Sequence, residues 1–328
     1  MGKRVLWIDN LSGLLIIQMI FLCHVRILAS SIPDTSILFD IQYVLIFFMP
    51  WFFYKSGMFY KEIPAKDGLK KDANKLLKPF LYYSLFGYVL QLTCVILRHE
   101  PMTFQTLVND QLMGLALYAG VSWEQPLWFL ITLFLVKNIF NFIQQYLNKY
   151  ILLIVSLLAA CYFSNQSLAL NFWIGTTCQS LFFYTLGYLL KGWQFRKELL
   201  FVSLLIYLSR YVFGWVHSWD ARINEIGVGD FYLLTILVLV SGIILFNNVF
   251  MKCFDRNIPL LSFIGEKSMF FFVAHFPCVM FCRLYVMPYL GMEGTMKGYC
   301  VCSFLMIIYL ALFYLLLSRL KQTRIKKV

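Results

Sequence analysis

The sequence predicts an all-α integral membrane protein with about ten transmembrane helices and both termini in the cytoplasm. Hydrophobic residues make up 61% of the 328 positions and charged residues only 13%, whereas a soluble domain is about half apolar and about a quarter charged. The apolar runs are as long as helices that cross a bilayer. They do not show the roughly ten-residue alternating segments of a membrane β-barrel. We therefore expect one membrane domain over residues 1–328.

Ten apolar segments are expected to cross the membrane. They cover residues 9–29, 38–60, 79–97, 126–146, 150–164, 171–190, 198–216, 230–251, 267–287 and 299–318. The first segment follows Lys3 and Arg4, as in a signal peptide, but it is long enough to span the bilayer and many further spans follow. We therefore expect it to be retained as the first helix. The half-apolar stretch 98–125 indicates a short re-entrant or interfacial helix.

The basic residues lie in alternate loops between the apolar runs. With both termini inside, 19 of the 28 Lys and Arg residues fall on the cytoplasmic side and four on the outside, as the positive-inside rule requires. The net charge of +12 is thus a topology signal and does not indicate nucleic acid as a partner.

The cytoplasmic loop 61–78 is especially basic and has two interpretations. It carries six lysines, among them Lys71, Lys75 and Lys78. One interpretation is that these charges orient the chain and contact anionic lipid headgroups. The other is that they form a rim that binds the phosphate groups of a ligand.

Other common motifs are missing. The nine cysteines are odd in number and form no CxxC pair, so buried apolar packing is expected for them and no metal site. The chain has no GxxxxGK[ST] loop, which argues against ATP-driven transport by this chain alone.

Few titratable side chains lie inside the expected spans. They are His24, Lys55, Lys137, Arg210, His275 and Arg283. Each would cost roughly 2–3 kcal/mol or more if it faced lipid, so most are expected to face protein or a wet cavity. His24, Arg210 and Arg283 fall in the outer halves of their helices, which suggests a polar cavity. Lys55 lies near the cytoplasmic end of its helix and is able to snorkel.

The two intramembrane histidines are the candidates for catalysis. An imidazole with a pKa of about 6.5 takes a proton readily near neutral pH. For His24 the alternative is a core histidine that hydrogen-bonds a neighbouring helix. His275 precedes Pro277, which should break its helix locally, and a broken helix at mid-depth is acceptable where it lines a cavity. The alternative for His275 is a role in helix packing.

Six segments of the chain carry a family resemblance. They are Arg4–His24, Phe47–Gly57, Lys75–Phe80, Pro126–Leu130, Leu186–Tyr188 and Ile264–Ser268, the last leading to His275 and Pro277. In their order and spacing they resemble the acyltransferase 3 family of bacterial membrane acyltransferases, which O-acylate sugars. Each segment alone is a weak signal, but together they extend over nearly the whole chain.

The resemblance implies a reaction and a location. A cytoplasmic acyl-CoA, with acetyl as the expected acyl group, would be the donor, and a hydroxyl of an envelope or exported glycan the acceptor. The protein would lie in the bacterial inner membrane among its lipids, with no tightly bound cofactor. A transporter or flippase of a lipid-linked sugar, with the buried charges binding pyrophosphate, is the alternative, and a non-catalytic membrane scaffold is a third interpretation.

The resemblance also implies roles for individual residues. His24 would be the catalytic base, with His275 as the second candidate. The remaining candidates also depend on charge and position in the chain. They are Lys71, Lys75 and Lys78 for donor binding, and Trp128, Arg210, Arg283 and Ser56 for the acceptor site or cavity lining. For Trp128 the alternative is an anchor at the membrane interface.

Two features depart from the family pattern. The family has an Arg or Lys separated by ten residues from the first-helix histidine, and this position is Gly13 here. The family's arginine-rich pair before the third helix is replaced by lysines, which bind phosphate as point charges without the bidentate geometry of arginine.

Overall fold

The structure is a computed structural model and is predominantly helical, as the sequence predicts. It describes residues 5–26, 44–99, 101, 103–121, 123–193, 195–213, 219–220, 225–226 and 231–325. In this part of the chain, strands are limited to a small ribbon in which β1 (Trp219–Asp220) pairs antiparallel with β2 (Glu225–Ile226). The chain forms two compact units. Unit 1 comprises Met1–Ile8 and Ile46–Arg256, and unit 2 comprises Asp9–Leu45 and Asn257–Val328.

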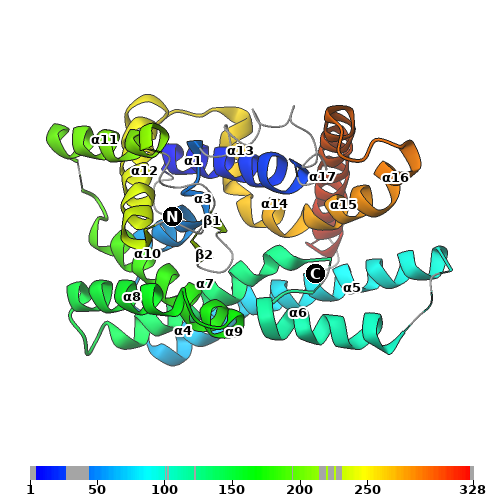
Figure 1. Cartoon of the computed structure of the whole chain (residues 1–328), viewed down its shortest axis with the longest axis horizontal. Coiled ribbons are helices and arrows are strands. Elements are labelled where there is room, and N and C mark those ends of the chain that lie inside the picture. The colour runs from blue at the N-terminus through cyan, green and yellow to red at the C-terminus, as the bar shows by residue number, and fades with distance from the viewer. Residues whose placement is uncertain are drawn as a thin grey trace. The chain divides into compact units, whose positions relative to one another are not determined.

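Unit 1 contains the helices from the second predicted span to the eighth (Figure 1). They are α3 (Phe48–Met58), α4 (Ala65–Asp72), η4 (Ala73–Leu77), α5 (Lys78–Leu97), η5 (Gln105–Asn109), α6 (Asp110–Tyr118), η6 (Gln125–Leu127), α7 (Trp128–Ile143), α8 (Lys149–Phe163), α9 (Leu168–Leu170), η7 (Asn171–Thr176), α10 (Thr177–Leu189), α11 (Lys197–Phe213) and α12 (Tyr232–Cys253).

The centre of unit 1 is a close pairing of α3 with α10. A Cβ atom on Gly57 would lie 1.9 Å from the backbone oxygen of Tyr184, and one on Gly187 would lie 2.0 Å from that of Tyr54. Only glycine permits this reciprocal approach, as at many helix contacts in membranes. The pairing holds the polar C-terminal end of α3 against α10.

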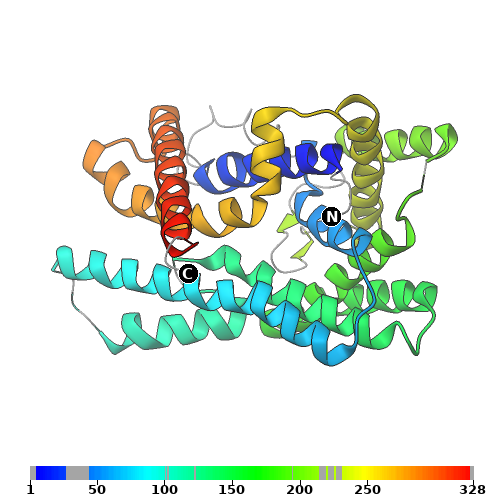
Figure 2. The ribbon, with the colours of Figure 1, turned by 180° about the vertical axis from the view of Figure 1, so that it is seen from behind.

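Helices α5 and α6 run side by side in unit 1, as both views show (Figures 1 and 2). The hydroxyl of Tyr88 donates to the backbone oxygen of Leu107 at 3.1 Å, and the amide of Gln111 donates to Gln91 at 2.9 Å. Helix α6 with η5 occupies the stretch 98–125, where the sequence predicts a short helix.

Unit 2 contains most of the first helix and the last part of the chain. Its elements are α1 (Leu6–Ile17, whose first three residues belong to unit 1), η1 (Gln18–His24), α13 (Pro259–Glu266), α14 (Ser268–Ala274), α15 (Phe276–Phe281), η8 (Cys282–Val286), α16 (Met287–Leu290) and α17 (Met296–Ile325). The long α17 crosses α15 (Figures 1 and 2).

Six helical segments of the described chain are long and apolar enough to cross a membrane. They are Leu6–His24, Ala65–Leu97, Gln125–Ile143, Tyr232–Cys253, Ser268–Leu290 and Met296–Leu320. The other predicted spans fall on α3, α8, the run from α9 to α10, and α11. The protein is thus a multi-pass helical membrane protein, while the count of ten spans, the cytoplasmic termini and the single domain stay predictions.

Candidate active site

His24 ends a π-helical turn at the end of the first helix of unit 2. The regular α1 gives way at Gln18 to η1, and His24 is its last residue. Insertions of π-helix are rare and occur often at functional sites, because the wider turn re-aims the side chains that follow. His24 is half-buried, so part of its side chain stays accessible.

The helix that carries His24 is anchored to α13 by close backbone contact. A Cβ atom on Gly13 would lie 2.2 Å from the backbone oxygen of Leu261, and one on Gly265 would lie 1.8 Å from that of Asp9. The hydroxyl of Ser262 donates to the side chain of Asn10 at 2.6 Å in the same contact. This explains the departure at Gly13, because a basic side chain has no room there in this helix pairing.

His275 lies at a break between two short helices. Helix α14 ends at Ala274 and α15 begins at Phe276, since Pro277 lacks the N–H that a continuous helix requires. The predicted break is therefore present. The His275 side chain is fully buried, and its Nδ1 lies 2.8 Å from the backbone oxygen of Phe272 and 3.1 Å from that of Phe271.

The two histidines are in direct contact. Nδ1 of His24 lies 2.7 Å from Nε2 of His275, and the rings are 4.8 Å apart between centroids at an angle of 22°. Phe276 presents its edge to the His24 ring at 5.4 Å. The two histidines are 251 positions apart in the sequence, so their contact could not be predicted, although each is a predicted site residue.

The hydrogen bonds determine which nitrogen of each neutral ring carries the proton. Backbone oxygens only accept, so Nδ1 of His275 donates and its Nε2 carries the lone pair. Nδ1 of His24 must then donate to that lone pair. As a result Nε2 of His24 is the basic nitrogen of the pair, which is the arrangement of a general base oriented by a second group.

The other predicted residues are distributed over both units. Arg283 is an exposed residue of η8 in unit 2. In unit 1, Trp128 is buried and makes edge-to-face contact with Phe172 at 6.3 Å. Arg210 is buried, and its guanidinium stacks between two tyrosine rings, Tyr207 at 4.2 Å and Tyr211 at 4.4 Å.

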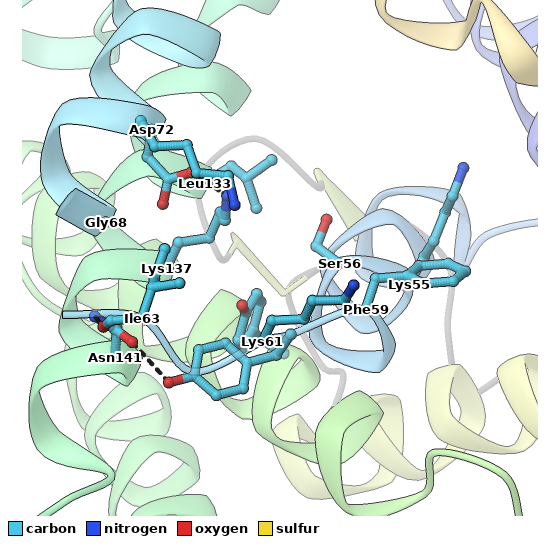
Figure 3. Close-up of a pocket in the computed structure, with 13 residues that line it drawn as sticks. Lys55, Ser56, Phe59, Lys61, Ile63, Gly68, Asp72, Leu133, Lys137 and Asn141 are labelled. Carbon is cyan, nitrogen blue, oxygen red and sulfur yellow. Dashed lines mark hydrogen bonds and ion pairs between the residues drawn. The ribbon is translucent and has the colours of Figure 1, made fainter. Parts of the chain in front are cut away.

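A pocket of about 280 Å³ brings further predicted residues of unit 1 together (Figure 3). Ser56 and Lys71 both line it. Lys75 and Lys78 do not, and both are exposed on η4 and α5, where the Lys78 amine lies 5.9 Å from the Tyr82 ring. The complete lining is Lys55, Ser56, Phe59, Tyr60, Lys61, Ile63, Gly68, Lys71, Asp72, Leu133, Lys137, Asn141 and Tyr184.

The sequence did not predict that most of these residues lie together in one pocket. Lys137 forms an ion pair with Asp72, which the sequence places 65 residues away in the basic loop. The available signal was a single lysine, Lys137, within an otherwise apolar span and three acidic residues among the six lysines of the loop 61–78. Neither residue alone indicated the other.

Glu124 is a second group that sequence reasoning missed. It precedes η6 in unit 1, is fully buried, and neither carboxyl oxygen has a hydrogen-bond partner among the described residues. Burial raises its pKa well above the ordinary value. The aliphatic part of the side chain packs against Gly87, where an added Cβ would lie 2.6 Å from Cγ of Glu124.

Within the described ranges, no group of three or more His, Cys, Asp or Glu residues is placed to hold a metal ion. In comparisons with known proteins, the model of the acyltransferase 3 family, described as an acyltransferase domain, matches residues 5–318. This range covers nearly the whole chain and includes both units. No curated protein and no solved structure matches the chain.

Proposed function

The chain belongs to the acyltransferase 3 family, and from this premise we propose that it is a membrane O-acyltransferase with His24 as its general base. The donor is an acyl-CoA from the cytoplasm, with acetyl as the expected acyl group. The acceptor is a hydroxyl of an envelope or exported glycan, and the location is the bacterial inner membrane.

The contact between His24 and His275 is the observation that carries this proposal. A sugar hydroxyl is a poor nucleophile at neutral pH and needs a base within hydrogen-bond reach. Nε2 of His24 accepts the hydroxyl proton while the oxygen attacks the thioester carbonyl. The carbon–sulfur bond then breaks, the acyl group stays on the oxygen, and the leaving thiolate takes the proton from Nε2 of His24, which restores the neutral base.

His275 acts through His24 in this proposal. Its Nδ1 is held by the backbone of α14, so its Nε2 remains available to accept from His24 and to favour one tautomer of that ring. It also stabilises the positive charge that His24 gains when it takes the proton. His275 is thus a positioning residue, and His24 is the catalytic residue.

The test is acyl transfer by the full chain with His24→Ala, followed by mass spectrometry of the envelope glycans. Loss of the general base should lower the rate by roughly 10²–10⁴-fold, while the amount of protein in the membrane stays the same. Cys23→Ala is the matched control, since Cys23 neighbours His24 in η1 and has no proposed role.

Full glycan acylation by the His24→Ala protein would remove His24 from the mechanism. Movement of a lipid-linked sugar across the membrane without any acyl donor would instead favour the transporter. A comparison of the glycans from cells with and without the gene identifies the acyl group that this protein adds.

A further inference from the structure

Arg210 is a buried cation of unit 1 that the proposed reaction does not use. It lies in the last turn of α11 and is only 4% exposed. We propose that Arg210, together with Tyr207 and Tyr211, forms a site for the phosphate group of a membrane lipid. The proposal goes beyond the acyltransferase reaction and does not depend on it, because the site uses none of the groups around His24.

Most hydrogen-bond donors of Arg210 have no acceptor. Nη2 donates to the hydroxyl of Tyr211. Nε and Nη1 have no hydrogen-bond partner among the described residues, and both atoms are shielded from solvent. Since Nε carries one N–H group and Nη1 carries two, three donors of a permanently charged group lack an acceptor. A buried guanidinium is normally paired with an anion, because burial removes the water that would otherwise stabilise its charge.

Two tyrosine rings hold the guanidinium in place. Its central carbon lies 4.2 Å from the centre of the Tyr207 ring and 4.4 Å from that of Tyr211, and the Tyr207 hydroxyl interacts with the guanidinium as well. Tyr207 is itself buried and meets the edges of two further rings, Phe246 at 6.2 Å and Phe47 at 6.4 Å. A donor group that is already fixed loses less conformational entropy when it binds a ligand.

Tyr211 covers the guanidinium from the side that faces away from the protein. It is 51% exposed, whereas Tyr207 is buried, so the Tyr211 ring is able to change its rotamer without displacing a packed neighbour. This movement would open Arg210 to an anion. The Tyr211 hydroxyl accepts from Nη2 and keeps its own proton, which it would donate to an oxygen of the ligand.

The surface beside Tyr211 indicates that the anion belongs to a lipid. This end of α11 exposes three apolar side chains, Leu208, Val212 and Phe213. A lipid would lay its hydrocarbon chain on this apolar surface and place its phosphate at the guanidinium, whereas a soluble anion gains nothing from the surface. Arginine is well suited to this group, because its planar N–H donors match the oxygens of a phosphate.

The alternative is a purely structural role for Arg210. An arginine that only extends towards the headgroup region keeps its charged group exposed, but here Nε and Nη1 are covered. An arginine that only packs on aromatic rings gains a cation–π interaction, but its N–H groups point along the guanidinium plane and stay unpaired. Neither role provides an acceptor for the three N–H groups.

The experiment measures binding to the full chain in micelles of a neutral detergent by calorimetry. The probes are dioctanoyl phosphatidylglycerol, farnesyl phosphate and inorganic phosphate. We expect at least one lipid phosphate to bind and inorganic phosphate not to bind. Arg210→Gln should weaken lipid binding roughly tenfold, because it removes the charge and most of the donors. Arg196→Gln is the matched control, since Arg196 is an exposed arginine just before the other end of α11.

The probes also separate the two sources of a lipid phosphate. Tighter binding of phosphatidylglycerol would identify a phospholipid, and tighter binding of farnesyl phosphate would identify an isoprenoid carrier, and either result supports the site. Equal lipid binding by the wild type and Arg210→Gln would overturn the proposal. Inorganic phosphate that binds as tightly as the lipids would overturn the assignment to a lipid.

Tyr211→Ala provides a second test that does not depend on how well Arg210→Gln folds. The Tyr211 ring is more than half exposed, so its loss leaves no buried cavity. Without this cover the lipid phosphate should associate several times faster in a stopped-flow measurement. An association rate equal to that of the wild type, or slower, would reject Tyr211 as the cover of the site.

The proposed function can fail separately. His24→Ala should bind the lipid phosphates normally, because His24 belongs to unit 2. Binding that depends on Arg210, with no acyl transfer from any acyl-CoA, would leave the lipid site standing and reject the acyltransferase reaction. Acyl transfer by a wild type that binds neither lipid phosphate would do the reverse.

Discussion

In unit 2, two histidines share one hydrogen bond around a fully buried ring, whereas in unit 1 four lysines line an open pocket around one covered carboxylate. The first arrangement holds two imidazole rings in a fixed hydrogen-bond pattern, which determines where the proton between them lies. The second keeps permanent charges within reach of solvent. The difference matches the two expected roles. A general base must accept a proton near neutral pH, whereas a site for phosphate needs positive charges that are always present.

From this contrast we expect substitutions in the two units to change different kinetic constants. Interactions made only in the transition state change kcat, and interactions made equally in the ground state change KM. Substitutions of His24 or His275 in unit 2 should therefore lower kcat. Substitutions of the lysines that line the pocket of unit 1 should raise KM for the donor. The following predictions test this division.

Apart from His24→Ala, the largest effect is expected at the glycines of the two helix contacts. Gly265→Ala in unit 2 and Gly187→Ala in unit 1 would each place a Cβ within 1.8 Å or 2.0 Å of a backbone oxygen. Overpacking of this kind typically costs about 1–3 kcal/mol, so thermal unfolding in detergent should show a similar loss for both. Only Gly265→Ala should lower kcat, since it displaces the helix that carries His24.

Gly68→Ala is a milder control, because its nearest neighbour is a side-chain nitrogen of Asn141 at 3.3 Å. A fall in kcat for Gly187→Ala as large as that for Gly265→Ala would show that the two units do not divide the kinetic constants. A Gly265→Ala protein as stable as the wild type would reject the close contact itself.

The next effect is expected at the positioning histidine. His275→Ala removes the acceptor of the His24 Nδ1–H bond, and a net loss of about 1.4 kcal/mol would lower kcat roughly tenfold. The donor KM should not change. His275→Gln should restore part of the rate, because its side-chain oxygen is able to accept the same hydrogen bond.

Steady-state kinetics of acyl transfer over a range of donor concentrations provide the measurement for the histidine variants. An unchanged kcat with a raised KM would place His275 in donor binding. If His275→Gln were no better than His275→Ala, the ring would matter for packing and its acceptor nitrogen would not.

The sequence alone predicted the features that arise from local chemistry. The apolar runs predicted the helices, because length and composition suffice for that purpose. The break at His275 followed from Pro277. The segments from Phe47 to Gly57 and around Ile264 predicted the family, since their order along the chain could be read directly.

The features that depend on contacts between distant segments were not predictable. His24 and His275 each stood out as titratable groups in apolar runs, but their contact joins residues 251 positions apart. The same holds for Asp72 with Lys137. In the sequence, Gly13 stands where the family has a basic residue. The structure explains the glycine, because a side chain at this position would collide with the backbone of Leu261.

The smallest effect is expected at Glu124. This residue tests whether the protonation state of a side chain depends on its burial or on the unit in which it lies. Glu124 lies in unit 1 with the charged lysines, yet it is as buried as His275 in unit 2. If burial decides, Glu124→Gln should be tolerated and should stabilise the protein most at high pH. Glu198→Gln is the matched control, since Glu198 is an exposed carboxylate of unit 1.

The sign follows from the raised pKa of Glu124 in the folded protein. In the unfolded chain the carboxyl group loses its proton near its ordinary pKa of about 4.3, while the folded protein retains the proton to higher pH. The unfolded state then binds fewer protons, so the free energy of unfolding falls as the pH rises through this window. Glu124→Gln removes that dependence, and its advantage in Tm over the wild type should grow between pH 5 and pH 8, by roughly 2–4 °C if about 1 kcal/mol is recovered. A Tm difference that is the same at both pH values would show that Glu124 is charged in the folded protein despite its burial. Exposure to solvent would then not be required for a charged side chain in unit 1.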